Sequence, residues 1–93
     1  MEIDKIASYV GFSIKSRQMV IGTDNILKSK KVKFVLCKDS LSENASKKLK
    51  SKFDCYTFSQ SDFERIVPLS GVQALGLTSE QLTKSIKNLL GVQ

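Results

Sequence analysis

Short β-forming segments alternate with helical patterns along the whole chain. The strand segments lie at residues 19–21, 32–37, 55–58 and 72–77. The run Val-Lys-Phe-Val-Leu-Cys at 32–37 predicts a central strand, because β-branched and aromatic residues fit a pleated surface. Apolar residues at helical spacing predict helices at about residues 2–16, 24–31, 40–53, 61–67 and 78–90. The alternation predicts an α/β fold, a three-layer α/β/α sandwich around a small mixed four-stranded sheet, with residues 1–93 as one domain.

Polar residues and a glycine predict where two of the helices begin and the last one ends. Ser40 with Glu43 three residues later has the pattern of a capping box, and Thr78 with Gln81 repeats it. Gly91 follows the last apolar repeat and predicts a helix C-cap. Ser40 and Thr78 are therefore the expected N-caps.

The net charge is +6 and it is unevenly distributed. Residues 15–52 hold eleven basic and three acidic residues, a net +8, whereas the rest of the chain holds four basic and six acidic residues, a net −2. A domain polarised in this way suits an anionic partner, with nucleic acid as the first candidate. The alternative is a charged surface that only keeps the protein in solution, and charge alone does not decide between them.

The composition argues against an enzyme, a metal site and a membrane protein. There is no histidine, so the commonest general base and metal ligand is missing. Cys37 and Cys55 lie in apolar runs, which predicts buried, reduced thiols of raised pKa rather than nucleophiles. No apolar run reaches about 18 residues and the N-terminus is charged, so we expect no membrane span, no secretory signal, no cofactor and a cytoplasmic location.

A glycine and three small polar residues, Gly22-Thr23-Asp24-Asn25, stand between a predicted strand and a predicted helix. Glycine allows another backbone to come close, and the first turn of a helix has unpaired N–H groups that can receive a phosphate or a base edge. Alternatively, the three polar residues are ordinary helix caps, and the sequence alone favours this second interpretation. No glycine-rich nucleotide-binding motif is present.

An apolar, small-residue loop, Pro68-Leu69-Ser70-Gly71-Val72, precedes the last predicted strand. Loops at one edge of an α/β sheet cluster in space, so this loop is a candidate neighbour of the Gly22 turn. A polar helix start beside an apolar loop suits an unstacked nucleotide, which needs both hydrogen bonds and an apolar contact. The alternative is a disordered connector.

Three segments of the chain resemble one protein family. Residues 22–28, Gly-Thr-Asp-Asn-Ile-Leu-Lys, resemble a helix opening of the form Gly-x-Asn/Glu/Lys-Glu/Gln-hydrophobic-x-Lys. Residues 38–48 match an acidic turn followed by a Ser-x-Asn-x-x-Lys-Lys helix, and residues 72–77 match a small-residue and valine run. Over about residues 4–90 the chain is similar to the ribosomal protein L-seven-Ae/L-thirty-e family, in particular to small bacterial members of the YlxQ type.

The resemblance implies an α/β/α sandwich that binds kink-turn or related bent RNA without catalysis and that associates with the ribosome. The family's second helix reads sheared G·A pairs, and its loop before the last strand covers a flipped-out nucleotide. Carried over by position, the RNA-binding residues are Gly22, Thr23, Asp24, Asn25 and Lys28 in the turn and Leu69, Ser70, Gly71, Val72 and Gln73 in the loop. Lys31, a basic residue shortly after the turn, is a further expected RNA-binding residue.

The chain departs from the family pattern in the turn and in the loop, where Pro68 and Leu69 are unusual, and Arg17-Gln18 replaces the family's usual Gly-Lys upstream. Asp24 replaces an Asn or Lys, and Asn25 replaces a Glu or Gln. A carboxylate accepts hydrogen bonds from guanine but repels phosphate. A second class of function therefore stays open, a protein-interaction module whose basic face docks an acidic, translation-related partner.

Overall fold

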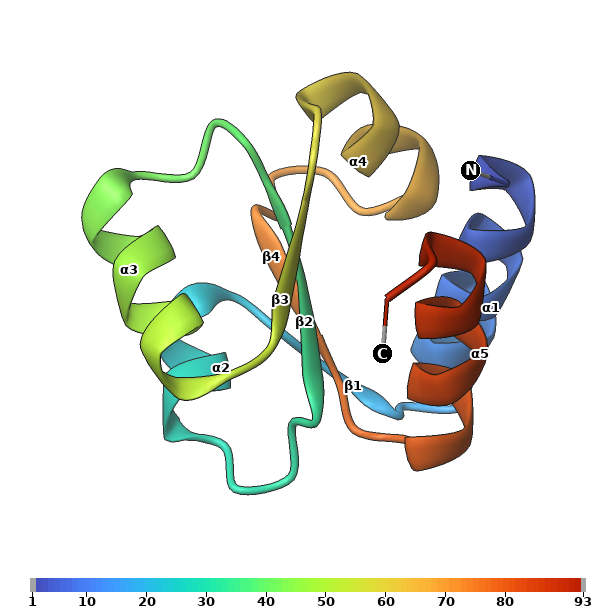
Figure 1. Cartoon of the computed structure of the whole chain (residues 1–93), viewed down its shortest axis with the longest axis horizontal. Helices are drawn as coiled ribbons and strands as arrows, with labels where there is room; N and C mark the ends of the chain where they lie inside the picture. Colours follow the sequence, from blue (N-terminus) through green and yellow to red (C-terminus); the bar gives the residue numbers. More distant parts are fainter. Residues whose placement is uncertain (1, 93) are drawn as a thin grey trace.

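A four-stranded sheet lies between two layers of helices in the computed structural model, which describes residues 2–92 (Figure 1). The strands are β1 (Met19–Ile21), β2 (Phe34–Lys38), β3 (Cys55–Phe58) and β4 (Ala74–Leu77), in the spatial order β1-β4-β2-β3. β2 and β3 are parallel, and β4 is antiparallel to both β1 and β2. The helices are α1 (Ile3–Lys15), α2 (Thr23–Lys28), α3 (Glu43–Lys52), α4 (Gln60–Ile66) and α5 (Glu80–Leu90). The expected three-layer sandwich with a mixed sheet is confirmed.

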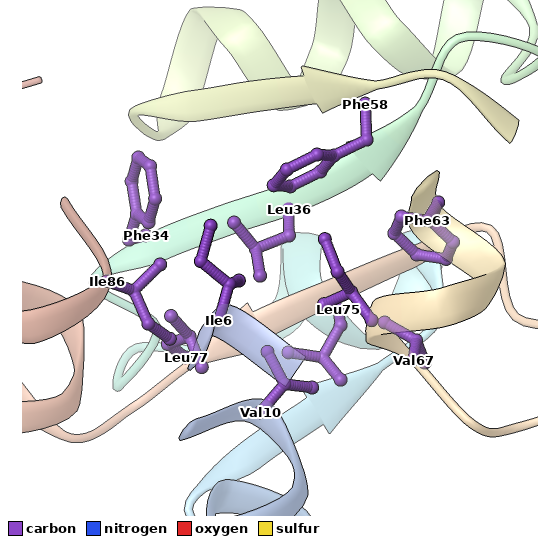
Figure 2. Close-up of a cluster of buried hydrophobic side chains, with 11 residues drawn as sticks. Ile6, Val10, Phe34, Leu36, Phe58, Phe63, Val67, Leu75, Leu77 and Ile86 are labelled. Carbon is purple, nitrogen blue, oxygen red and sulfur yellow. The ribbon is translucent and has the colours of Figure 1, made fainter. Parts of the chain in front are cut away.

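Both faces of the sheet are covered, so the chain has two hydrophobic clusters. In β2, Phe34 and Leu36 belong to the larger cluster, which α1, α4 and α5 complete (Figure 2). Val35 and Cys37 point to the other side and join the smaller cluster beneath α2 and α3. Side chains alternate along a strand, and with both faces buried the strand needs a continuous apolar run. This explains why residues 32–37 predicted a central strand.

The strand β4 carries large side chains on one face and almost none on the other. Leu75 and Leu77 belong to the larger cluster, whereas Ala74 and Gly76 lie toward α2. A Cβ atom at Gly76 would lie 2.8 Å from Cγ2 of Val32 and 3.3 Å from Cγ1 of Ile26. The missing side chain at Gly76 therefore lets α2 and the residues after it pack directly on the sheet.

The predicted N-caps of α3 and α5 are wrong by one or two residues. Ser42 caps α3, where its Oγ accepts from the Ala45 N–H at 3.3 Å. Ser40 instead lies in a turn closed by the Leu41 N–H donating to the Lys38 carbonyl. The N-cap residue directly precedes the helix, and the helix can begin only after the Lys38–Leu41 turn is complete. The cap is therefore Ser42 and not Ser40.

The same reason applies at the start of α5, and two further helix ends can be compared with their predictions. The Thr78 N–H donates to the Gln18 carbonyl, so Ser79 is the cap and accepts from the Leu82 N–H at 3.2 Å. The helix α2 ends at Lys28 rather than near residue 31, because Ser29 is extended (φ −77°, ψ 141°). Gly91 is left-handed (φ 74°, ψ 23°), which confirms the predicted C-cap.

Candidate nucleic-acid interface

Strand pairing places the Gly22 turn beside the loop that precedes β4. The Gly22 N–H donates to the Ala74 carbonyl at 3.1 Å, directly beyond the paired residues Ile21 and Leu75. On the opposite side, the Lys38 N–H donates to the Gln73 carbonyl at 3.1 Å. The end of the loop is thus held between the ends of β1 and β2, and the expected proximity of turn and loop is confirmed.

The Gly22 turn has a geometry that requires glycine and lacks a side-chain cap. Gly22 is the N-cap of α2 with φ 95° and ψ 140°, a region that L side chains rarely adopt. No side chain caps this helix, so the cap interpretation of Thr23, Asp24 and Asn25 is wrong. The amide Nδ2 of Asn25 instead donates to the Ile21 carbonyl at 3.0 Å, which closes the turn. Asp24 and Asn25 are exposed, and Thr23 is half-buried.

The loop is anchored to the core by two of its apolar residues. Leu69 and Val72 are partly buried and pack against the larger cluster. Ser70, Gly71 and Gln73 are exposed, and Gly71 has a φ of 77° that again favours glycine. The loop therefore presents Pro68 and its polar and glycine residues to solvent, while Leu69 and Val72 serve the fold.

A cavity of about 280 Å³ lies beneath this loop and includes residues that sequence reasoning missed. Lys38, Phe63 and Glu64 form its other wall. The Nζ atom of Lys38 lies 5.7 Å from the centre of the Phe63 ring and 3.9 Å from Oε1 of Glu64. The sequence did carry one signal for this position. Lys38 is a charged residue directly after the predicted buried strand 32–37, at the edge where the loops gather.

The helix α2 separates two of the predicted site residues from the others. Lys28 is its last residue, and Lys31 follows in the connection to β2. A helix of six residues is about 9 Å long. In Figure 1 the α2–β2 connection lies at the bottom of the molecule, whereas the loop before β4 crosses the top. The structure therefore does not bring Lys31 to the loop.

The positive charge is concentrated on the layer of α2 and α3. Within residues 2–92, seven lysines of this layer form no ion pair with a carboxylate: Lys28, Lys30, Lys31, Lys33, Lys48, Lys50 and Lys52. On the other layer, Arg65 pairs with Asp4 at 2.9 Å and Lys5 pairs with Glu2 at 3.5 Å. We call the seven residues the lysine layer.

The two thiols differ in how far they are buried. Cys37 is buried as expected, but Cys55 is only half-buried, which corrects the prediction that both are core residues. Partial burial is the main cause that raises the pKa of Cys55 from 9.0 to about 11, and the neighbouring Cys37 and Asp54 add to it while Lys50 opposes it. Among residues 2–92, no group of three or more His, Cys, Asp or Glu side chains gathers to hold a metal.

Cys55 is expected to resist alkylation in the native protein. With its pKa raised from 9.0 to about 11, the thiolate at pH 8 is about 100-fold scarcer than in an ordinary cysteine. The unfolded chain ionises first, so the free energy of unfolding should also fall as the pH rises from 9.0 toward 11. Iodoacetamide labelling followed by peptide mapping measures the alkylation rate of each of the two thiols, with the urea-unfolded protein as control. Equal labelling of native and unfolded Cys55 would contradict the shifted pKa.

Comparison with known proteins identifies the fold and no function. No family model and no curated protein matches the chain. Among solved structures, the chain is similar to a protein of unknown function from Bacillus halodurans C. The TM-score is 0.80 and the identity 16%, over 94% of this chain and 97% of that one. At this identity the similarity shows a shared fold. In the part of the chain that the structure describes, no helix is long and apolar enough to cross a membrane.

Proposed function

We propose that the protein is a non-enzymatic, ribosome-associated RNA-binding protein that recognises bent RNA of the kink-turn type. The observation that carries the proposal is the hydrogen bond from the Gly22 N–H to the Ala74 carbonyl. It ties the polar turn to the first residue of β4, directly after the small-residue loop and some fifty residues away in the sequence. The turn and the loop are the two segments that the resemblance to the L-seven-Ae/L-thirty-e family assigns to RNA.

The two segments supply complementary groups for a nucleotide outside a base stack. The turn offers the side chains of Asp24 and Asn25, and the loop offers Ser70 and Gln73 with glycine backbone between them. Hydrogen bonds to exposed base edges specify a sequence or a bend, whereas contacts with phosphate only position the protein. The lysine layer on α2 and α3 supports RNA as the ligand, because its charges form no ion pairs with carboxylates within residues 2–92.

Variants of the turn test the proposal. Asn25→Ala is expected to weaken binding to a kink-turn RNA by about 1–3 kcal/mol, the usual contribution of a base-edge contact. Asp24→Asn should tighten it, because a negative charge near phosphate is removed. The measurement is a pair of titrations at one fixed salt concentration, one with kink-turn RNA and one with an unkinked duplex of the same length.

Two controls separate recognition from stability and from charge. Asn25→Ala also removes the hydrogen bond to Ile21, which costs about 0.5–1.5 kcal/mol of stability, so unfolding is measured in parallel. Lys84→Ala removes an exposed cation that forms no ion pair within residues 2–92 and lies in α5 on the opposite layer, and it should leave both titrations unchanged. Unchanged kink-turn binding in both turn variants would reject the site. Displacement of the RNA by an acidic polypeptide at equal charge would favour a protein partner instead.

A further inference from the structure

Four residues of the lysine layer surround one open depression, at the opposite end of α2 from the Gly22 turn. The depression has a volume of about 550 Å³. Lys50 and Lys52 line it from the last turn of α3, and Lys30 and Lys33 line it from the connection between α2 and β2. We call these four side chains and the depression the lysine pocket. The turn, the loop and the kink-turn proposal do not account for it.

The charge of the lysine pocket is not balanced by the protein. Asp54 is the one carboxylate among the residues that line the pocket, and it already pairs with Lys87, at 3.5 Å between Oδ2 and Nζ. None of the four lysines forms an ion pair anywhere in residues 2–92. Four cations around one depression repel one another and raise the local concentration of anions.

Helix ends account for only part of this charge. Both α2 and α3 end at the pocket, and basic residues in a last turn offset the negative end of a helix. The Nζ atom of Lys52 in fact donates to the carbonyl of Leu27. Each helix end carries about half a negative charge. Two ends therefore offset about one of the four lysines, which leaves about three positive charges without a structural role.

The donors in the pocket suit a group with several oxygens. Lysine carries three N–H donors on a flexible stem and binds phosphate as a point charge. The hydroxyl oxygen of Ser29 accepts from the Lys31 N–H at 3.1 Å, so the proton of this hydroxyl remains to be donated. Ser51 donates its own proton to the Lys48 carbonyl at 2.9 Å and contributes none.

We propose that the lysine pocket binds a phosphate group. The phosphate comes either from the backbone of a nucleic acid or from a small phosphate ligand. For the first source the inference rests on the proposed RNA-binding function. The helix α2 is about 9 Å long, so a single RNA strand can contact the Gly22 turn and the lysine pocket together. For the second source it stands alone.

A matched pair of double variants tests the pocket in the full chain. Lys33→Gln with Lys50→Gln removes two pocket charges but keeps the first two methylene groups of each side chain, and it leaves Lys52 to cap α2. Lys15→Gln with Lys84→Gln removes two exposed cations that lie in α1 and α5, also without ion pairs within residues 2–92. Thermal unfolding of both variants checks that the fold is intact.

The readouts are amide shifts in two-dimensional NMR and the salt dependence of RNA binding. Pyrophosphate and a single-stranded oligouridylate are titrated separately, and shifts at residues 29–33 and 50–54 report occupation of the pocket. The pocket variant should lose these shifts. Its slope of log affinity against log salt should become shallower by about 0.7, the value for one phosphate contact on a single strand. The control variant should keep both the shifts and the slope.

The outcomes separate this inference from the proposed function. Shifts with RNA alone assign the phosphate to a nucleic-acid backbone, and shifts with pyrophosphate alone assign it to a small ligand. Pocket shifts with pyrophosphate in a protein that binds no RNA would support the pocket and reject the proposed function. RNA binding that depends on Asn25 but has the same salt slope in both double variants, with no shift by pyrophosphate, would overturn the pocket and leave the proposed function intact.

Discussion

Replacing Phe63 with alanine is expected to destabilise the protein by about 3–5 kcal/mol, the usual cost of removing a buried phenylalanine ring. Phe63 is 1% exposed and lies in the larger hydrophobic cluster beside Val67 (Figure 2). A chain of 93 residues has a total stability of roughly 5–14 kcal/mol. The variant is therefore expected to lose a large part of this stability, which urea unfolding measures.

The matched control for this variant is Phe12→Ala. Phe12 lies on α1 and is 53% exposed, so the same truncation leaves no cavity and should change the stability by about 0.5 kcal/mol or less. The ring of Phe63 also lines the cavity beneath the loop before β4 and lies under Lys38. Equal destabilisation by the two variants would show that the core is not where the structure places it.

Replacing Gly76 with valine is expected to cost about 3 kcal/mol or more. Adding methyl groups to a packed interior typically costs 1–3 kcal/mol. At Gly76 the first added atom already lies 2.8 Å from the branched side chain of Val32, which has little freedom to move away. The two further methyl groups of valine increase the overlap. Thermal and urea unfolding of the variant measure the loss.

A double-mutant cycle identifies the clash as the cause. Gly76→Ala should destabilise the wild type more than it destabilises the Val32→Ala variant, because the shortened side chain vacates the overlapping space. Gly11→Ala is the control. A Cβ at Gly11 has no atom within 4 Å and lies in α1, so alanine there should stabilise the protein by about 0.5–1 kcal/mol. Additive effects of the two substitutions at 76 and 32 would contradict the close packing of Val32 on Gly76.

Most of the fold could be predicted from the sequence, because the spacing of apolar residues marks each helix and strand within its own segment. Strand β3 begins and ends at the predicted residues, and α1 differs from its prediction by one residue at each end. The caps were less predictable, because Ser40 and Ser42 have the same chemistry and only the turn at Lys38–Leu41 decides between them. A hydrogen bond outside the helix therefore determines which serine caps it.

The candidate sites were only partly readable from the sequence. The proximity of the Gly22 turn to residues 69–73 followed from the expected sheet, since loops at one edge of a sheet gather together. The internal hydrogen bond of Asn25 did not follow, because it depends on the conformation of Gly22. Lys30 and Lys50 are twenty residues apart, and no motif joins them. Only the packing of α2 against α3 places both at one pocket.

The order of the strands in the sheet also has a consequence for when the protein can act during its synthesis. β4 is the neighbour of both β1 and β2. Ile21 in β1 pairs with Leu75 in β4, so β1 has no partner strand until Leu75 has been synthesised. Contacts between such distant segments form late and slow the folding of a domain. A ribosome-bound nascent chain that ends before Leu75 already carries every residue of the lysine layer but has no joined turn and loop. Under the function proposed above, such a chain would attract RNA by charge, and it would acquire the means to discriminate among RNAs only when β4 is inserted.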